Sequence, residues 1–237
     1  MGQTLTVESA GAKMGLYEAQ PKGAAKGAVI VIQEAFGVTD HIKDVCDRFA
    51  AEGYLAVAPH IFHRTGDPII SYDRMQDVLP HVMGCKVDGL VADVDAALVH
   101  LKGAGFEPKQ VGIVGFCLGG SVAFLIAARR EIGASVTFYG GGITAARFGG
   151  VPMVEAAPAL KTPWLGLYGD VDLTIPFTEV EVLRRAAKRA PVATDVTRYP
   201  DADHGFHCDA RPSYHEASAK DGWRRTLEWF GTHLRAR

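Results

Sequence analysis

The stretch that decides the fold is GIVGFCLGGS, residues 112–121. It begins with the apolar run of a strand buried on both faces, as in a parallel sheet. A turn flanked by Gly115 and Gly119 follows, with Cys117 at its centre, and a very apolar helical segment comes directly after it. This order places the thiol at the N-terminus of a helix, where the helix dipole and free N–H groups favour a thiolate and an oxyanion. Cys117 is therefore a candidate nucleophile.

The same stretch allows other interpretations. G-x-nucleophile-x-G between a strand and a helix is the nucleophile elbow of α/β-hydrolases, where side chains at the flanking positions would clash with the turn. A packed structural cysteine would also fit the pattern. A dinucleotide-binding loop is a weaker rival, because the G-x-G-x-x-G spacing is absent. Ser121 could centre a second elbow, but it falls a full turn into the helix, so Cys117 is better placed.

Strand and helix patterns alternate outward from this stretch. Residues 4–19 predict an opening β-hairpin, and buried-strand runs occur at residues 27–37 and 54–62. A helical pattern at residues 40–53 lies between these two runs, with Asp40 as its expected N-cap. The later strands are expected at residues 110–116, 134–140, 162–170 and 193–200, and the later helices at 87–105, 117–130, 176–190 and 212–234.

This alternation predicts the fold class. Strands separated by helices favour an α/β-hydrolase type of doubly wound, mostly parallel sheet with helices on both faces. Residues 64–85 and 140–160 are expected to be irregular, the first with a short helix. We see no linker or composition shift, so residues 1–237 are interpreted as a single domain. In such sheets ligands bind at the carboxyl ends of the strands, which directs the search to the loops there.

Composition excludes several function classes. The net charge of −2 gives no reason to expect nucleic acid or a membrane surface as a partner. No apolar run is long enough for a transmembrane helix, and no signal peptide pattern is present. The four scattered cysteines fit a reduced, cytoplasmic protein better than a disulfide framework. We expect a monomer or small homo-oligomer acting on a small molecule.

A thiol nucleophile needs a base, and the base needs an acid that orients it. In α/β-hydrolases the chain order is nucleophile, acid, histidine. His204 lies in the DADHGF loop after the last strand, where the base is expected. The YGDVDLTIP segment supplies the acid, and Asp172 is favoured over Asp170, which more readily shapes the turn. A helix cap, a turn former or a solvated loop histidine are the structural alternatives for these residues.

Metal ligation and cofactors find little support in the sequence. His60 and His63 could chelate an ion, and so could the cluster at residues 204–208. Neither group has the helical i, i+4 spacing or the matched cysteine pair of a zinc site. We expect neither a metal nor a cofactor.

Nearly the whole chain resembles the dienelactone hydrolase family, the carboxymethylenebutenolidase-like branch of the α/β-hydrolases. The resemblance implies a triad of Cys117, Asp172 and His204, the same residues reached above. The elbow with cysteine and the Q-E-x-F-G strand end are its most specific features. The resemblance rests on VIVIQEAFG, GYLAVAP, VGIVGFCLGGSVAF, LYGDVDLTIP and DADHGFHCDARPSY.

The resemblance also implies further roles. Glu34 would lie beside the cysteine and take the thiol proton as substrate binds, although a salt-bridged residue at a strand end is the structural alternative. The backbone N–H groups of Leu118 and Ala35 would form the oxyanion hole. Phe36 would contribute to the substrate site. A carboxylate near Cys117 would disfavour a permanent thiolate, which protects the sulfur from oxidation.

One departure from the family concerns the substrate. Dienelactone hydrolase binds its substrate's carboxylate with arginines, one of them four residues after the histidine, and here that position is Cys208. Arg211 is near, and Arg74 or Arg64 could contribute. The departure leaves the hydrolase chemistry intact but puts the dienelactone substrate in doubt.

The resulting prediction is a hydrolase that opens a small ester or lactone, such as an enol lactone, through a Cys-His-Asp triad and a thioester intermediate. A general carboxylesterase with the same triad is the first alternative. A non-catalytic ligand receptor on a hydrolase fold is the second.

Overall fold

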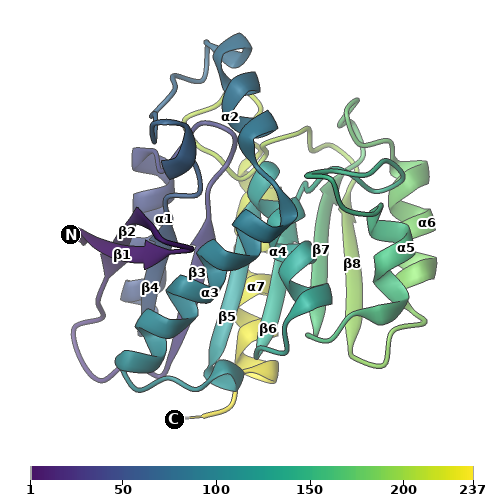
Figure 1. Ribbon diagram of the computed structural model, residues 1–237. Helices are drawn as coiled ribbons and strands as arrows, with labels where there is room; N and C mark the ends of the chain where they lie inside the picture. Colours follow the sequence, from purple (N-terminus) through teal and green to yellow (C-terminus); the bar gives the residue numbers. More distant parts are fainter. Residues whose placement is uncertain (1, 237) are drawn as a thin grey trace.

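The computed structural model describes residues 2–236, and one eight-stranded sheet forms its centre (Figure 1). The strand order is β1-β2-β4-β3-β5-β6-β7-β8, and every pairing from β4 to β8 is parallel. The hairpin of β1 and β2 forms one edge and joins β4 in the antiparallel sense. The strands are β1 (Gln3–Ser9), β2 (Ala12–Ala19), β3 (Gly27–Ile32), β4 (Tyr54–Pro59), β5 (Val111–Phe116), β6 (Ala134–Phe138), β7 (Trp164–Gly169) and β8 (Thr194–Tyr199).

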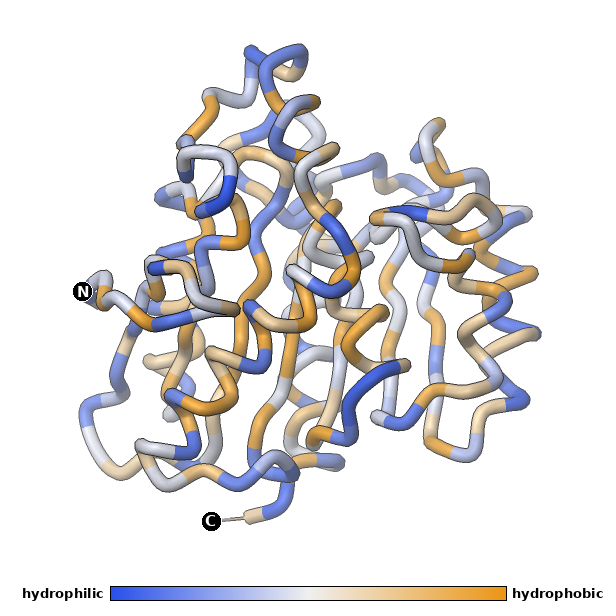
Figure 2. Tube along the Cα trace, viewed as in Figure 1, coloured by the Kyte–Doolittle hydropathy of each residue, from blue (hydrophilic) through white to orange (hydrophobic). Residues whose placement is uncertain are grey.

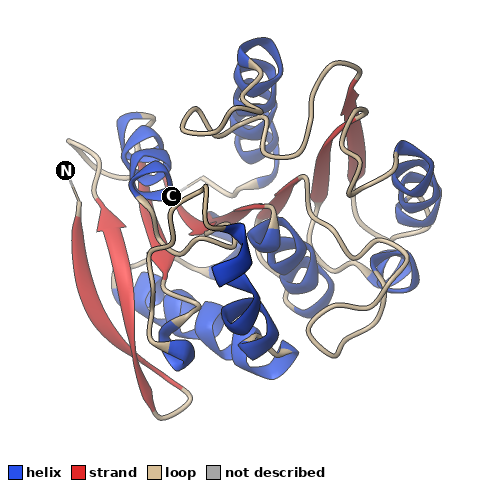
Figure 3. Ribbon diagram, turned by 90° about the horizontal axis from the view of Figure 1, so that it is seen from above, coloured by secondary structure: helices blue, strands red, loops and turns tan. Residues whose placement is uncertain are grey.

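Helices cover both faces of the sheet, which confirms the predicted fold class (Figure 3). Helices α3 and α4 lie on one face, and α1 and α7 pack together on the other (Figure 1). The helices are α1 (Asp40–Ala51), α2 (Leu79–Gly84), α3 (Val87–Gly103), α4 (Leu118–Arg129), α5 (Met153–Ala156), α6 (Phe177–Ala187) and α7 (Glu216–His233), with short 3-10 turns η1 (His63–Thr65), η2 (Met75–Val78), η3 (Pro108–Gln110) and η4 (Ala157–Ala159).

The hydrophobic pattern explains this layering. All residues of β3, β4, β5, β6 and β7 are buried, as their continuous apolar runs require between two helical layers. Figure 2 shows hydrophobic strands at the centre and alternating hydrophobic and polar turns in the outer helices, most clearly in α6. No helix within residues 2–236 has the length and apolar character needed to cross a bilayer.

Three element boundaries differ from the sequence-based expectation. Helix α1 has Thr39, not Asp40, in the N-cap position, and Asp40 is its first residue. Helix α7 begins at Glu216 rather than at residue 212, because turns occupy the segment before it. The segment 140–160, expected as a loop, contains α5 and η4. The segment with η1, η2 and α2 projects beyond the carboxyl ends of the strands (Figure 1).

Candidate active site

The strand-to-helix turn at Cys117 has the geometry of a nucleophile elbow. Cys117 lies between β5 and α4 at φ 55° and ψ −115°, a strained conformation for a residue with a side chain. A Cβ at position 115 would overlap the Gly119 carbonyl, and one at position 119 would overlap the carbonyls of Ile32 and Gln33. The two glycines therefore let the turn close against itself and against the end of β3. Cys117 is partly exposed, whereas the other three cysteines are buried.

Asp172 and His204 meet at the carboxyl ends of β7 and β8. His204 Nδ1 lies 2.7 Å from Asp172 Oδ2. The other carboxylate oxygen, Oδ1, accepts hydrogen bonds from the Thr174 hydroxyl at 2.6 Å, the Thr174 N–H at 2.8 Å and the Ile175 N–H at 3.2 Å. Asp172 is only 3% exposed, so these bonds fix its orientation. Asp170 is not available for His204, because Arg198 binds both of its oxygens.

Charge interactions in this site outweigh burial. Burial alone would lower the pKa of His204, but hydrogen bonds to Asp172 and Cys117 raise the pKa to about 10. Burial alone would raise the pKa of Asp172, but the bonds from His204 and Thr174 bring the pKa below its usual range. His204 therefore interacts with both Cys117 and Asp172, and the carboxylate fixes the orientation of the ring.

The two expected oxyanion-hole donors lie next to Cys117 in sequence or space. Leu118 is the first residue of α4, so its N–H has no intrahelical acceptor. Ala35 follows the end of β3, which the elbow contacts through Gly119. Within the described part of the chain, neither N–H takes part in a hydrogen bond. Both groups are thus available to a bound oxyanion.

Glu34 is paired with Arg211. Arg211 Nη1 donates to Glu34 Oε1 at 3.2 Å, and the other oxygen, Oε2, is buried without a partner among the described residues. Glu34 is 1% exposed. Burial lowers the pKa of Arg211, but the neighbouring charge of Glu34 outweighs burial, and the pKa lies above its usual value. Arg211 therefore neutralises the buried Glu34 carboxylate.

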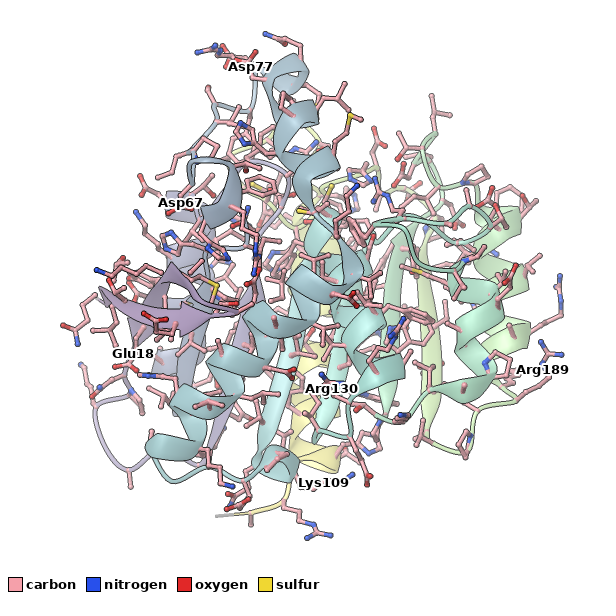
Figure 4. All side chains as sticks on the ribbon, viewed as in Figure 1. Glu18, Asp67, Asp77, Lys109, Arg130 and Arg189 are labelled. Atoms are coloured by element: carbon pink, nitrogen blue, oxygen red, sulfur yellow. The ribbon has the colours of Figure 1, made fainter. Side chains whose placement is uncertain are left out.

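Of the other predicted substrate-binding residues, Phe36 lies beside Arg211, whereas Arg74 lies away from the site. Phe36 is buried and, with Tyr72, forms an aromatic wall beside the Arg211 guanidinium. Arg74 pairs instead with Asp77, at the tip of the projecting segment in Figure 4. Within residues 2–236 no hydrogen bond or ion pair joins Arg74 to the triad.

Arg64 does not contribute to the site either. Its guanidinium makes two hydrogen bonds, of 2.8 and 2.9 Å, to the fully buried Asp93 on α3. Asp93 also accepts from the Ser9 hydroxyl at 2.5 Å and lies 3.0 Å from His63. This group ties the edge hairpin to α3 and explains both Arg64 and His63 structurally.

Two residues near the triad were not singled out by the sequence. Tyr139, directly after β6, has φ 38°. Its ring packs against the His204 ring at a tilt of 58°, with the ring centroids 5.1 Å apart. Its hydroxyl is buried without a partner in the described structure. Thr174 positions Asp172. Tyr139 could have been proposed from the sequence, because it directly follows a parallel strand, where ligand sites lie. Nothing in the sequence distinguished Thr174 from an ordinary loop threonine.

Among the described residues, no group of three or more histidine, cysteine or acidic side chains is arranged to hold a metal ion. His60 instead bonds to Asp67 at 2.7 Å. His207 is enclosed by Phe116 and Phe138, and burial lowers its pKa well below the usual value. Both histidines are accounted for by packing and local bonds.

The fold and the elbow together define an α/β-hydrolase. The sequence profile of the dienelactone hydrolase family matches residues 14–234, and the chain belongs to this family. Among similar sequences, "Putative carboxymethylenebutenolidase" of Salmonella typhimurium is 43% identical over 235 residues, covering 96% of this chain and 86% of that protein. The protein of the same name in Escherichia coli K12 is 41% identical, covering 95% and 84%.

Solved structures agree with this assignment. The crystal structure of a "Putative Dienelactone Hydrolase" from Klebsiella pneumoniae has a TM-score of 0.90 at 38% identity and covers 98% of this chain and 99% of that one. A dienelactone hydrolase-like promiscuous phosphotriesterase, P91, from metagenomic libraries has a TM-score of 0.81 at 19% identity, covering 99% of each chain. The second likeness shows the fold alone.

Proposed function

We propose that this protein hydrolyses a small ester or lactone, with Cys117 as nucleophile, His204 as acid and base, and Asp172 as the residue that orients His204. The 2.7 Å bond between His204 and Asp172 beside the strained elbow carries the proposal. The order of the three residues along the chain matches that of α/β-hydrolases. Relatives named carboxymethylenebutenolidase support a lactone as the substrate class.

The chemistry follows from the arrangement. The Cys117 thiolate attacks the acyl carbon, and the N–H groups of Leu118 and Ala35 hold the oxyanion. An enolate leaves easily and needs no proton to depart. Acylation removes the negative charge from sulfur, so the pKa of His204 falls. His204 can then accept a proton from the water that hydrolyses the thioester.

Glu34 and Arg211 fit a role in controlling the thiol. We propose that Glu34 accepts the Cys117 proton when an anionic group of the substrate draws Arg211 away. The support is the pairing of Glu34 with Arg211 through one oxygen only, which leaves Oε2 buried and unpartnered. Until then Glu34 is held in its ion pair with Arg211.

The nucleophile is tested by substitution and mass spectrometry. A lactone and an aryl ester are assayed with the wild-type protein and with Cys117→Ala, and the acylated protein is trapped by acid quench. We expect the substitution to abolish turnover and an acyl adduct to map to the peptide that contains Cys117. Full turnover by Cys117→Ala would exclude this mechanism. Ser121→Ala serves as control, because its hydroxyl donates to the Gly141 carbonyl.

The same assay separates the alternatives. A dienelactone-like hydrolase should prefer the unsaturated lactone, because Arg211 can contact an anionic substrate. A general carboxylesterase should hydrolyse the neutral aryl ester at least as well. A receptor would bind without turnover, and the intact hydrogen-bonded pair of Asp172 and His204 argues against that function.

A further inference from the structure

A second cavity lies away from the catalytic residues. It is enclosed by α4, the start of α3 and the segment 141–156. Cys117, Asp172 and His204 do not line it. Its walls are mainly apolar, formed chiefly by Phe124, Leu125, Phe148, Val151 and Met153.

Arginines are the only charged residues that line this cavity. They are Arg129, at the end of α4, and Arg147, in the segment after β6. Within residues 2–236 neither guanidinium forms an ion pair with a carboxylate. Arg130, the next residue along the chain, differs in this respect because two hydrogen bonds tie it to Asp95 (Figure 4). Both arginines are exposed, so the rim of the cavity carries positive charge that no carboxylate among the described residues pairs with.

Ser121 holds one of these arginines at the cavity. Arg147 Nη1 donates to Ser121 Oγ at 3.2 Å, and Ser121 itself donates to the Gly141 carbonyl at 2.7 Å. Ser121 is 5% exposed and belongs to α4, so it is a fixed support. A single bond leaves most guanidinium donors available, and a guanidinium matches a carboxylate with two parallel bonds.

The size of the cavity limits the ligand. Its volume is about 60 Å³. At about 10–15 Å³ for each water-sized group, this space admits roughly four to six such groups. A short or singly branched chain of up to about six heavy atoms therefore fits, and an aromatic ring does not, because a cavity that holds benzene has a volume of about 150 Å³.

We propose that this cavity binds a small carboxylate with a short apolar body, such as propanoate or 2-methylpropanoate. The carboxylate contacts Arg147 and Arg129, and the apolar body lies against Phe124 and Met153. The ligand also touches Gly141, two residues after Tyr139, whose ring packs against His204. A bound ligand therefore contacts the segment that carries Tyr139. The binding itself does not depend on the proposed function.

Calorimetric titration of the full-length protein tests the proposal. 2-Methylpropanoate is the probe, and 2-methylpropanamide, inorganic phosphate and benzoate are the comparisons. We expect 2-methylpropanoate to bind at least tenfold more tightly than each comparison, because the amide lacks charge, phosphate lacks an apolar body and benzoate is too large. Equal affinity for phosphate and 2-methylpropanoate would show that the apolar walls contribute nothing, and would overturn the proposal.

Variants locate the binding. Arg147→Gln should weaken binding of 2-methylpropanoate at least tenfold, and Ala128→Leu, which fills the cavity, should do the same. Arg189→Gln removes an exposed charge on a residue that does not line the cavity and should leave affinity within twofold. Protein alkylated at Cys117 should still bind 2-methylpropanoate. Binding that alkylation abolishes and Arg147→Gln leaves unchanged would assign 2-methylpropanoate to the catalytic site and refute the proposal.

Discussion

Asp172 illustrates how single residues are positioned here. One oxygen meets His204, while the other is held by Thr174 and Ile175. Removing the Asp172 charge should therefore weaken its interaction with His204 and leave the backbone of residues 172–175 in place. Asp172→Asn is expected to lower kcat by up to about 10⁴-fold, the loss found when the acid of a serine-protease triad is replaced by asparagine. Steady-state rates on the better substrate measure this loss. Ser121→Ala, which lies outside the triad, is the control and should lose little.

The titration of His204 provides a second test of the same contact. Its pKa of about 10 in the folded protein exceeds the value of about 6.5 in an unfolded chain. The His204–Asp172 interaction therefore stabilises the fold fully below about pH 6.5, and this stabilisation is lost as pH rises through about 10. NMR of the His204 ring should show no titration between about pH 5 and 8 in the wild-type protein. A midpoint near 6.5 would show that Asp172 and Cys117 do not raise the pKa of His204.

The Glu34–Arg211 pair should be costly to break from one side. Both side chains are largely buried, so Arg211→Met leaves an uncompensated carboxylate. We expect a loss of about 3 kcal/mol in the free energy of unfolding. Glu34→Gln in the Arg211→Met background should restore part of it, because the unpaired charge is then absent. Urea unfolding of the four proteins gives the coupling energy. Simple additivity of the two substitutions would show that the pair does not interact.

Sequence reasoning predicted a candidate triad but not the contacts around it. Cys117, Asp172 and His204 were identified because each follows a strand in the order that α/β-hydrolases use. Among the candidate arginines, however, the sequence could not choose. Arg211 meets Glu34 across 177 positions, and only the folded chain brings them together. Arg74 had a partner three residues away, Asp77, and that local pairing explains its position outside the site.

At the scale of elements, local patterns located the strands and helices better than their ends. Strands β3, β5 and β7 could be predicted from their apolar runs alone, because every residue in them is buried. The start of α7 was placed about four residues early, because residues 212–215 form turns whose bonds depend on the preceding loop, such as His215 N–H to the Phe206 carbonyl. Helix α5 was missed because four residues are too few for a helical period.

The contact between α4 and β3 depends on a single glycine. A methyl group at position 119 would overlap two carbonyls at the end of β3, and main-chain atoms cannot move aside as a flexible side chain can. Gly119→Ala should therefore reduce the free energy of unfolding by about 3 kcal/mol or more, an effect of overpacking. Gly103→Ala is the matched control, because nothing lies within 4 Å of the added methyl. That change should be neutral or slightly stabilising. Similar losses for both variants, measured by urea unfolding, would refute the close-contact argument.

At the scale of the whole molecule, the carboxylate of Asp221 links the last helix, α7, to the edge strand β8. Asp221 on α7 accepts the Tyr199 hydroxyl of β8 at 3.0 Å and pairs with Arg224 and Arg225. Burial alone would raise the pKa of Asp221, but these bonds lower it to about 2. The corresponding value in an unfolded chain is about 3.9. This difference links the packing of α7 on the sheet to pH.

The consequence is a specific loss of stability in acid. Because the folded pKa lies below the unfolded one, the stabilisation from Asp221 is present above about pH 4 and is lost as pH falls through about 2. Asp221→Asn should cost about 1 kcal/mol at neutral pH, since the group is partly exposed. The difference from the wild-type protein should shrink as pH is lowered from about 5 towards 2. Glu228→Gln breaks only an exposed pair with Arg224 and should change stability by less than about 0.5 kcal/mol. A constant difference between the wild-type protein and Asp221→Asn at every pH would mean that Asp221 acts through packing rather than charge.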